Sequence, residues 1–377
     1  MSRTATKPRT SAPASGTTAP ASKPHTGRVA HAKPRANINS NDVTFAPEYT
    51  VTSTTDSGGR VLKNIEVICC FWGTYWTTSP PPSPSTGDYA TAINAILTSS
   101  YMSRLNQYRG IGNGSLVYCD FNDSSDPADG YTDDKVVSML KDRLQNTPMP
   151  MPAAGVDRFY AVIVPPGIHN ALTQDAGQHQ SFDYNGTKGY YAWISNNGSL
   201  TGHNCVTKVF SHELVEACTD PDVDNNNGNG ILVNGTQAGG TAVVNDEIGD
   251  TCNDQYATVN MNGIMCTVQS YWSKADNACV LPVPPAKGGS LDIVAIRKAF
   301  SSDQGVDYIT ELKAQDASGL TYWLSRADVI NLMYGNANTF FVNGDDGSRA
   351  QVIAHGHYIE TVADNSTRDN LLSLPTF

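Results

Sequence analysis

The stretch VLKNIEVICCFWG, residues 61–73, changes from a mixture of polar and apolar residues to an apolar run. This pattern predicts a strand that leads from the solvent into the core. A Pro-rich loop follows, and in residues 88–108 apolar side chains recur every four positions from Ile93 to Leu105. This spacing predicts a helix with one apolar stripe. The folded part of the chain is therefore predicted to begin with a strand followed by a helix.

The alternation of strands and helices continues along the chain. The segments SLVYCDF, RFYAVIVPPG and GYYAWIS, which begin at Ser115, Arg158 and Gly189, predict further strands. The segment TDDKVVSMLKDRLQ predicts a helix, with Thr132 as its N-cap and acidic residues in its first turn. With one more helix at 204–218, this order predicts an α/β fold built on a layered mixed sheet.

The length and the composition divide the chain into a tail and two domains. A chain of 377 residues is too long for one average core. Residues 1–41 are rich in Pro, Ala, Ser and Thr, hold no apolar run, and are predicted to be disordered. The Pro/Gly cluster at 282–289 predicts a linker. We expect a main domain over 42–281 and a small α+β domain over 290–377.

The charge is unevenly placed. Residues 1–41 carry seven Lys and Arg and no acid, and the remainder carries a formal charge of −18. An acidic body argues against nucleic acid as the main partner, since phosphate binding needs a basic face. It suits a protein that collects cations. No apolar stretch approaches the 18 residues of a membrane span, so none is expected.

The cysteines and the amino-terminal segment point to different compartments. Cys252, Cys266 and Cys279 lie in polar, loop-rich sequence, where a disulfide is expected if the compartment is oxidising. The first 40 residues lack the apolar core of a secretory signal. The cysteines favour an extracellular location and the missing signal a cytoplasmic one, so the location stays open, as does the oligomeric state.

The segment KVFSHELVEACTDPD, residues 208–222, contains the pattern H-E-x-x-E. Apolar residues four apart from Val206 to Leu214 predict a helix here, with Asn204 as its N-cap and an end before Pro221. His212 and Glu216 are one turn apart, so they point the same way. The alternative is that these residues are only the solvated face of an ordinary helix.

The spacing of these residues fits a metal site. An imidazole nitrogen and a carboxylate oxygen one turn apart can bind one ion, and three protein ligands plus an open position make a catalytic site. Glu213 projects about 100° round the helix, where it would take a proton from bound water. The third ligand is expected to be Glu247, in VVNDEIGDTCND, or His179, in the Gly-rich loop DAGQHQSF, with Asp250 as an outer partner. Zinc is the favoured ion.

The run DPDVDNNNGNG, residues 220–230, suggests a second kind of ion. Asp220, Asp222 and Asp224 alternate as oxygen ligands do in a calcium loop. An EF-hand is excluded, because its sixth position would be Asn225 rather than Gly and its twelfth Ile231 rather than Glu. A looser calcium site and a plain polar loop both stay open.

A set of motifs in fixed order gives a family resemblance over about residues 60–283. The motifs are NIEVICCFWGTYW, SSYMSRLNQYRGIG, FYAVIVPPG, SHELVEACTDP, DEIGDTC and VQSYWSKADNACV. They resemble the Exordium-like (phosphate-induced protein) family. The matching residues are His212, Glu213, Glu216, Thr219, Asp220, Pro221, Glu247, Ile248, Asp250 and Cys252. Plant members are secreted wall proteins linked to growth, and the resemblance implies no catalytic assignment. Residues 291–377 resemble a small bacterial domain of unknown function.

Three classes of function follow from these patterns. The first is a zinc-dependent hydrolase, most simply a peptidase with Glu213 as general base. The second is a metal-stabilised binding protein, whose aromatic patches FWGTYW and GYYAWIS would line a groove for carbohydrate or peptide. The third is a structural or signalling module with a vestigial site. A third ligand and an open cleft at His212 favour the first class, and a Glu213 buried in an ion pair favours the third.

Overall fold

The computed structural model describes residues 35–36 and 43–376, apart from 123, 172–175, 198–199, 201, 224–228, 286, 302–304, 318, 320, 357 and 363–369. The predicted disordered tail, 1–41, lies almost entirely outside the described residues, as does Asp224 of the predicted calcium loop. Among the described residues, no helix is long and apolar enough to cross a membrane, as the sequence predicted.

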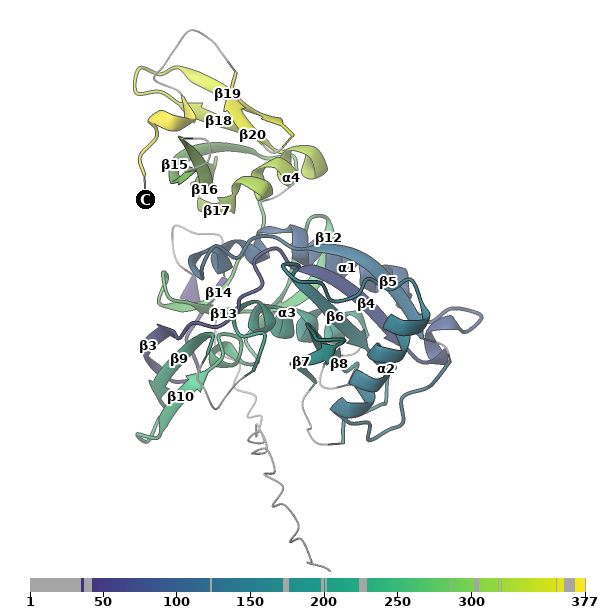
Figure 1. The fold of residues 1–377 in the computed structure, drawn as a ribbon. Coiled ribbons are helices and arrows are strands. Elements are labelled where there is room, and N and C mark those ends of the chain that lie inside the picture. The colour runs from purple at the N-terminus through teal and green to yellow at the C-terminus, as the bar shows by residue number, and fades with distance from the viewer. Residues whose placement is uncertain are drawn as a thin grey trace, which may run out of the picture.

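A five-stranded sheet forms the centre of the main body (Figure 1). Its order is β5-β4-β6-β8-β7, and all neighbours are parallel except β7, which is antiparallel to β8. The strands are β4 (Glu66–Trp72), β5 (Ser115–Asn122), β6 (Arg158–Ile163), β7 (Gly177–Tyr184) and β8 (Thr187–Ile194). The predicted mixed α/β fold is confirmed at this level.

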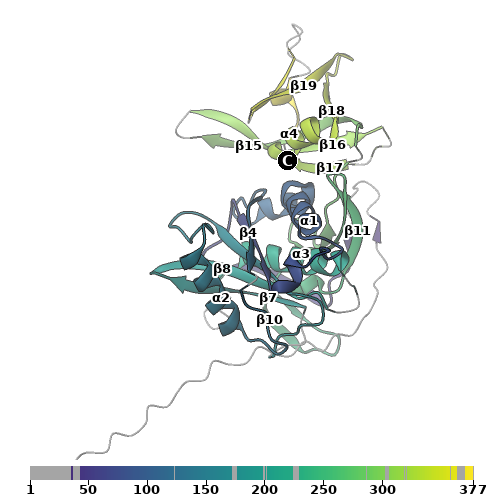
Figure 2. The same cartoon turned by 90° about the vertical axis from the view of Figure 1, so that its right-hand side faces the viewer.

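Helices cover both faces of this sheet, as Figure 2 shows for α2 on one side and for α1 and α3 on the other. Successive residues of β4 point to opposite faces: Cys69 packs in the cluster that includes α1 and α3, and Cys70 in the cluster that includes α2. The helices are α1 (Thr86–Thr98), α2 (Asp133–Asn146) and α3 (His203–Thr219). Burial on both faces explains why β4 is apolar at every position after Glu66 rather than alternating.

Two helix predictions need correction in detail. The helix expected over 88–108 is divided into α1 and the 3-10 helix η2 (Ser100–Gln107), because Ser99 is extended and its side chain accepts a hydrogen bond from the amide of Tyr101. Thr132 does occupy the N-cap position of α2, but its side chain makes no capping hydrogen bond.

The Gly-rich loop expected around His179 is instead the edge strand β7. Asn185 and Gly186 both have positive φ, 53° and 79°, which is the backbone of a tight hairpin turn. This turn folds 177–184 back along β8, with His179 opposite Ala192. The Asn-Gly pair in DYNGTKGYY was the sequence signal for this hairpin.

Smaller sheets pack beyond α3 and complete the main body. Their strands are β1 (Arg35–Ala36), β2 (Val43–Phe45), β3 (Thr50–Asp56), β9 (Ile231–Thr236), β10 (Ala242–Asp246), β11 (Tyr256–Met261), β12 (Ile264–Gln269), β13 (Tyr271–Ser273) and β14 (Ala278–Leu281). Two 3-10 turns also belong to the main body: η1 (Thr74–Thr77) lies between β4 and α1, and η3 (Asp250–Cys252) lies between β10 and β11. A disulfide links Cys252 of η3 to Cys279 of β14, while Cys266 is a buried free thiol.

The carboxyl-terminal residues form a six-stranded sheet of order β17-β16-β15-β18-β19-β20 with its own apolar cluster. Its elements are β15 (Ser290–Ser301), β16 (Val306–Asp316), β17 (Thr321–Ser325), α4 (Arg326–Asn336), β18 (Thr339–Asn343), β19 (Arg349–His355), β20 (Tyr358–Thr361) and η4 (Leu371–Ser373). The division into two independent domains stays a prediction.

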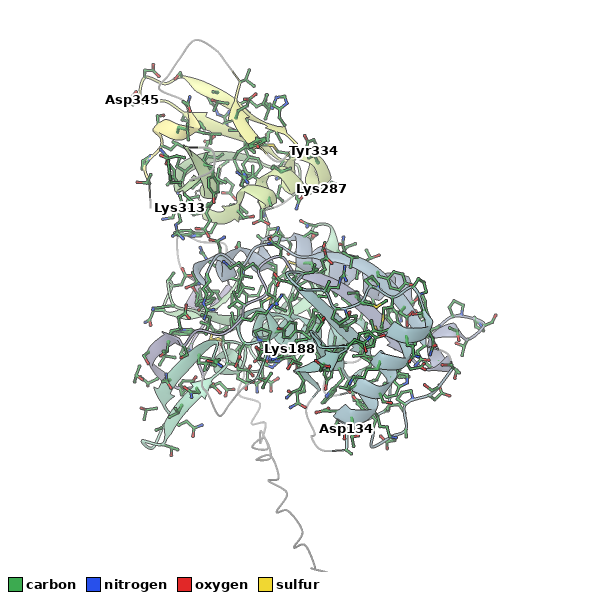
Figure 3. All side chains as sticks on the ribbon, in the orientation of Figure 1. Asp134, Lys188, Lys287, Lys313, Tyr334 and Asp345 are labelled. Carbon is green, nitrogen blue, oxygen red and sulfur yellow. A yellow bond between two sulfur atoms is a disulfide. The ribbon has the colours of Figure 1, made fainter. Side chains whose placement is uncertain are left out.

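Polar contacts join this sheet to the main body. The guanidinium of Arg104 lies 4.3 Å from the ring centroid of Trp323, and Asn113 donates to Asp328 at 2.8 Å. Lys313, on the side of the sheet that faces the main body in Figure 3, also lies over Trp323. In the predicted linker 282–289, the prolines at 282, 284 and 285 are buried, so the exposed connection is shorter than predicted.

Candidate metal centre

Helix α3 is buried on nearly every side. It begins at His203, after Gly202, rather than after the predicted N-cap Asn204. Glu213 and Glu216 are only 2% exposed, because β7, β8 and β12 all pack against the helix. The two glutamates are therefore not part of a solvated helix face, which was the alternative to a metal site.

His179 reaches α3 from β7. Its Nδ1 lies 3.4 Å from Glu213 Oε2 and 3.6 Å from Glu216 Oε2. Its Nε2 lies 3.3 Å from Glu247 Oε1 and hydrogen-bonds the carbonyl oxygen of Asp220 at 3.1 Å. Both ring nitrogens face acceptors, so the ring is placed to carry two protons as an imidazolium.

His212 lies nearer the solvent. Its Nε2 is 3.3 Å from Glu216 Oε2 and 3.6 Å from Asp250 Oδ1. The side chains of His212 and Asp250 are 18% and 19% exposed, whereas that of Glu216 is 3% exposed. These three residues form a group that solvent can reach, with the buried carboxylate of Glu216 behind it.

Two groups of three residues thus share Glu216. The ligand atoms of His179, Glu213 and Glu216 all lie within 4.8 Å of one another, and so do those of His212, Glu216 and Asp250. Asp250, which the sequence placed as an outer partner, stands in the group of His212. Glu247, expected as a ligand beside His212, contacts His179 instead.

The cluster is rich in negative charge. Burial raises the pKa of Glu216 well above its usual value, and the charges of Glu247, Asp250 and Glu213 add to this. Burial acts to lower the pKa of His179, but Glu247 and the hydrogen bonds to Glu213 and Glu216 outweigh it and hold that pKa well above its usual value. The carboxylates of the cluster would therefore be stabilised by an additional positive charge placed between them.

Two buried carboxylate oxygens of the cluster have no hydrogen-bond donor among the described residues, Glu216 Oε1 and Glu247 Oε1. His179 Nε2 lies within ion-pair distance of Glu247, but its hydrogen bond goes to the carbonyl oxygen of Asp220. Buried acceptors are nearly always bonded. Glu216 Oε1 is therefore available to a cation, whereas Glu247 Oε1 already faces the imidazolium of His179.

Two glycines allow the backbone to approach these carboxylates. A Cβ atom at Gly177 of β7 would lie 2.6 Å from Glu213 Oε1, and one at Gly249 would lie 2.6 Å from Glu216 Oε1. Real Cβ atoms do not come so close to other atoms. The absence of a side chain at each position is thus a requirement of the cluster.

Gln269, at the end of β12, holds the ring of His212 and was not foreseen from the sequence. Its Nε2 lies 2.6 Å from His212 Nδ1 and donates to the carbonyl oxygen of Gly249 at 3.2 Å. His212 Nδ1 then accepts a hydrogen bond from Gln269, and His212 Nε2 carries the ring proton, which points toward Glu216. For His212 Nε2 to bind a metal, the ring proton must move to His212 Nδ1. The amide of Gln269 would then have to turn so that its Oε1 accepts this proton, and its hydrogen bond to Gly249 would be lost.

The predicted calcium loop is only partly described. Asp220 is buried, and Asp222 accepts a hydrogen bond from the Nζ of Lys188, labelled in Figure 3, at 2.8 Å. Asp224 lies outside the described residues. Calcium binding therefore stays a prediction, with one of its three carboxylates already paired to a lysine.

The aromatic patch GYYAWIS does not line a groove. Tyr190, Tyr191 and Trp193 are at most 3% exposed and pack in the two cores beside the central sheet. Of the patch FWGTYW, Phe71, Trp72 and Trp76 are buried and Tyr75 is partly exposed.

Comparison of the chain with protein-family models, with curated proteins and with solved structures found no match.

Proposed function

We propose that His212, Glu216 and Asp250 bind a divalent metal ion, most simply zinc, and that the chain is a metal-dependent hydrolase acting on peptides. The observation that carries the proposal is the convergence of these three side chains from α3 and η3 at an edge that solvent reaches. One imidazole and two carboxylates are a ligand set that zinc accepts, and solvent access provides the open position of a catalytic site.

The distances within the group support this reading. In a tetrahedral site with bonds of about 2.0–2.2 Å, ligand atoms lie about 3.4 Å apart. His212 Nε2 lies 3.3 Å from Glu216 Oε2 and 3.6 Å from Asp250 Oδ1. A cation between these atoms would also balance the excess negative charge of the carboxylates in the cluster. The same spacing occurs between His179, Glu213 and Glu216, so distance alone does not choose between the two groups.

Glu213 is the residue that we assign to proton transfer, with His179 as its charged partner. A bound divalent ion lowers the pKa of its water ligand and polarises a substrate carbonyl. Glu213 Oε2 would accept the proton of the attacking water, while the imidazolium of His179, whose Nδ1 lies 3.4 Å away, would keep both of its own protons. His179 would keep Glu213 ionised until that step.

The edge strand β7 supports a peptide as the substrate. No further strand pairs with β7 among the described residues, and β7 itself contributes His179 to the cluster. An extended peptide can add to the free edge of such a strand through backbone hydrogen bonds. We retain the resemblance to the Exordium-like family as a proposal for the ancestry of residues 60–283, resting on the motifs alone.

A second candidate function is a metal-stabilised protein without catalysis. The burial of Glu213 favours it, and favours equally the module with a vestigial site that the sequence suggested, since a general base needs access to water and Glu213 is 2% exposed and paired with His179. In that case the ion would hold α3 to η3 and would take no part in chemistry.

Metal analysis and a peptide digest test the proposal together. Purified protein should hold about one zinc per chain after incubation with zinc and dialysis, and His212→Ala should lose it. His355→Ala, which removes an exposed histidine paired with Glu360, is the matched control. Cleavage of a mixed peptide library by the zinc form alone would support the hydrolase. Equal zinc in His212→Ala and wild type would overturn the ligand set, and zinc binding without cleavage would favour the second candidate.

A further inference from the structure

Two free cysteines lie opposite each other on neighbouring strands of the central sheet. Cys69 of β4 and Cys119 of β5 are direct partners in the parallel register of these strands, and neither belongs to the disulfide of the main body. Neighbouring strands lie about 4.8 Å apart, and the Cα atoms of a disulfide lie about 4.4–6.8 Å apart. The two backbones therefore already stand at a separation that a disulfide accepts.

The two side chains lie on the same face of the sheet. Cys69 belongs to the apolar cluster beside α1 and α3, and Cys119 packs against that cluster. The thiol of Cys69 donates a hydrogen bond to Cys119 Sγ. Cys70, the next residue of β4, points to the opposite face, where its thiol donates to Met149 Sδ at 3.6 Å. Cys69 is therefore the thiol that Cys119 can reach.

Cys119 is the free cysteine that solvent can reach. The free cysteines are Cys69, Cys70, Cys119, Cys205, Cys218 and Cys266. Five of these six are buried, and Cys119 is partly exposed. Its strand, β5, is an outer strand of the central sheet, and no further strand pairs with it among the described residues (Figure 1). Phe121, which shares the face of Cys119, is 41% exposed. A reagent in solution therefore meets Cys119 first.

The hydrogen bond between the thiols makes them unequal. It lowers the pKa of Cys119, against the effect of burial. The same hydrogen bond raises the pKa of Cys69 well above its usual value, and burial adds to this. A thiolate is the nucleophile in thiol–disulfide exchange, and the thiol of lower pKa supplies more of it at neutral pH. Cys119 is thus the thiol that attacks first, and Cys69 is the thiol that follows.

We propose that Cys119 and Cys69 form a redox-active pair that exchanges with small-molecule disulfides. The Cys119 thiolate attacks one sulfur of the disulfide, whose S–S bond breaks and releases one thiolate. Cys69 Sγ then attacks Cys119 Sγ, the mixed disulfide breaks, and the second thiolate leaves. The protons of the two cysteines pass to the two released thiolates. The pair is oxidised to one disulfide, and the small disulfide is reduced to two thiols.

This pair differs from the disulfide between Cys252 and Cys279. Both of those cysteines are 0% exposed, so a small thiol or disulfide has no direct access to them. A bond between Cys69 and Cys119 would tie the outer strand β5 to β4, and its partly exposed sulfur would keep the bond open to reduction. The inference does not rest on the proposed hydrolase, since the pair includes no residue of the metal centre.

Alkylation and mass spectrometry of the full chain, with a metal chelator present, test the proposal. In the native protein, iodoacetamide should modify Cys119 at least about tenfold faster than any other thiol. After incubation with glutathione disulfide and removal of the excess, alkylation of the denatured chain should count two thiols fewer than the six of the untreated protein. Peptide mapping should find the new bond between Cys69 and Cys119.

Variants separate the two steps. Cys69→Ala should stop at the mixed disulfide, with one glutathione on Cys119, and Cys69→Ser serves the same purpose if the alanine variant does not fold. Cys119→Ser should keep all its remaining thiols. Cys266→Ala, which removes a buried thiol of the same apolar cluster as Cys69, is the control and should form the bond as wild type does.

Three results in the wild-type chain would overturn the proposal. The first is the absence of a bond between Cys69 and Cys119 after treatment with glutathione disulfide. The second is alkylation of Cys119 no faster than that of the buried thiols. The third is a bond that forms with hydrogen peroxide but not with glutathione disulfide, since it would exclude a disulfide as the substrate.

Discussion

Gly249 and Glu216 touch so closely that the backbone of one defines the position of the other's carboxylate. A Cβ atom at Gly249 would lie 2.6 Å from Glu216 Oε1 and 3.0 Å from its Cδ. Glu216 is 2% exposed, so it cannot swing into solvent to make room. The turn that carries Asp250 is thereby held against α3.

Gly249→Ala should displace Glu216 and weaken zinc binding by about 10–100-fold, the usual cost of disturbing the support of a ligand. Overpacking should lower the free energy of unfolding by about 1–3 kcal/mol as well. Gly335→Ala is the control, because a Cβ atom there, within α4, meets nothing within 4 Å. Competition with a fluorescent zinc chelator measures the affinities. An unchanged affinity in Gly249→Ala would mean that Glu216 is no ligand.

Glu213→Gln and Glu216→Gln should fail in different ways if the ion is catalytic. Glu213→Gln should keep zinc and lose about 10²–10⁴-fold in peptide hydrolysis, because an amide cannot accept the proton. Glu216→Gln should instead lose zinc, since a neutral amide oxygen is a poorer ligand than a carboxylate. Glu66→Gln, at a glutamate paired with Arg158, controls for the loss of any charge. Hydrolysis that persists in Glu213→Gln would exclude it as the base.

The metal-free protein should lose stability as the pH rises above about 6.5, the value of an unperturbed histidine. The folded-state pKa of His179 is raised, because its carboxylate partners outweigh the effect of burial. The contribution of His179 to the free energy of unfolding is therefore complete below its pKa in the unfolded chain. It is lost as the pH rises through its pKa in the folded protein. The raised pKa of Glu216, caused first by burial, acts in the same direction.

Urea unfolding in the presence of a chelator, from about pH 6 to pH 9, measures this effect. His179→Gln should be less stable than wild type at the acidic end, and the two proteins should converge toward the alkaline end. Added zinc should stabilise wild type more at high pH, because protons compete with the metal for the same groups. A constant difference between the two proteins across the range would contradict the raised pKa.

Trypsin should cut the folded part of the chain first after Lys287. Lys287 and Gly288 are exposed, whereas the prolines at 282, 284 and 285 are buried. Cuts in the tail 1–41 should come earlier, as its composition predicts. Gel filtration should show the two fragments still together, because Arg104 contacts Trp323 and Asn113 bonds Asp328. Lys287→Gln should remove the cut, and a first cut within β15 would refute the boundary.

The helices α1, α2 and α3 and the strands β4, β5, β6 and β8 could be predicted because each carries a regular apolar pattern. β7 could not be predicted from such a pattern, since His179, Gln180 and Ser181 interrupt it. The pairing of β7 with β8 depends on the turn at Asn185 and Gly186. This two-residue signal is easily missed, because the residues before it are mostly polar. Likewise Ser99 ends α1 through one side-chain hydrogen bond, although the apolar spacing continues past it.

His179, Glu247 and Asp250 could be named from the sequence as candidates for the site, but exact partners could be predicted only for residues that share one helix. The spacing of His212 and Glu216 brings them together without knowledge of the fold. The position of Glu213 against His179, and of Asp250 beside His212, depends on β7 and η3, which approach α3 from distant parts of the sequence. Gln269 lies 57 residues from His212 and has no motif of its own. Tertiary packing decides these partners, and periodicity carries no information about it.

The cystine between Cys252 and Cys279 would make ion binding at the proposed centre depend on redox conditions. Cys252 ends the short turn η3 that begins with Asp250, and Cys279 belongs to the buried strand β14. Once the bond is reduced, η3 is held by hydrogen bonds such as those from Thr251 to Glu247 and from the Glu48 amide to Thr251. Asp250 would then belong to a looser segment, so the affinity for an ion would report whether the protein is in an oxidising or a reducing environment.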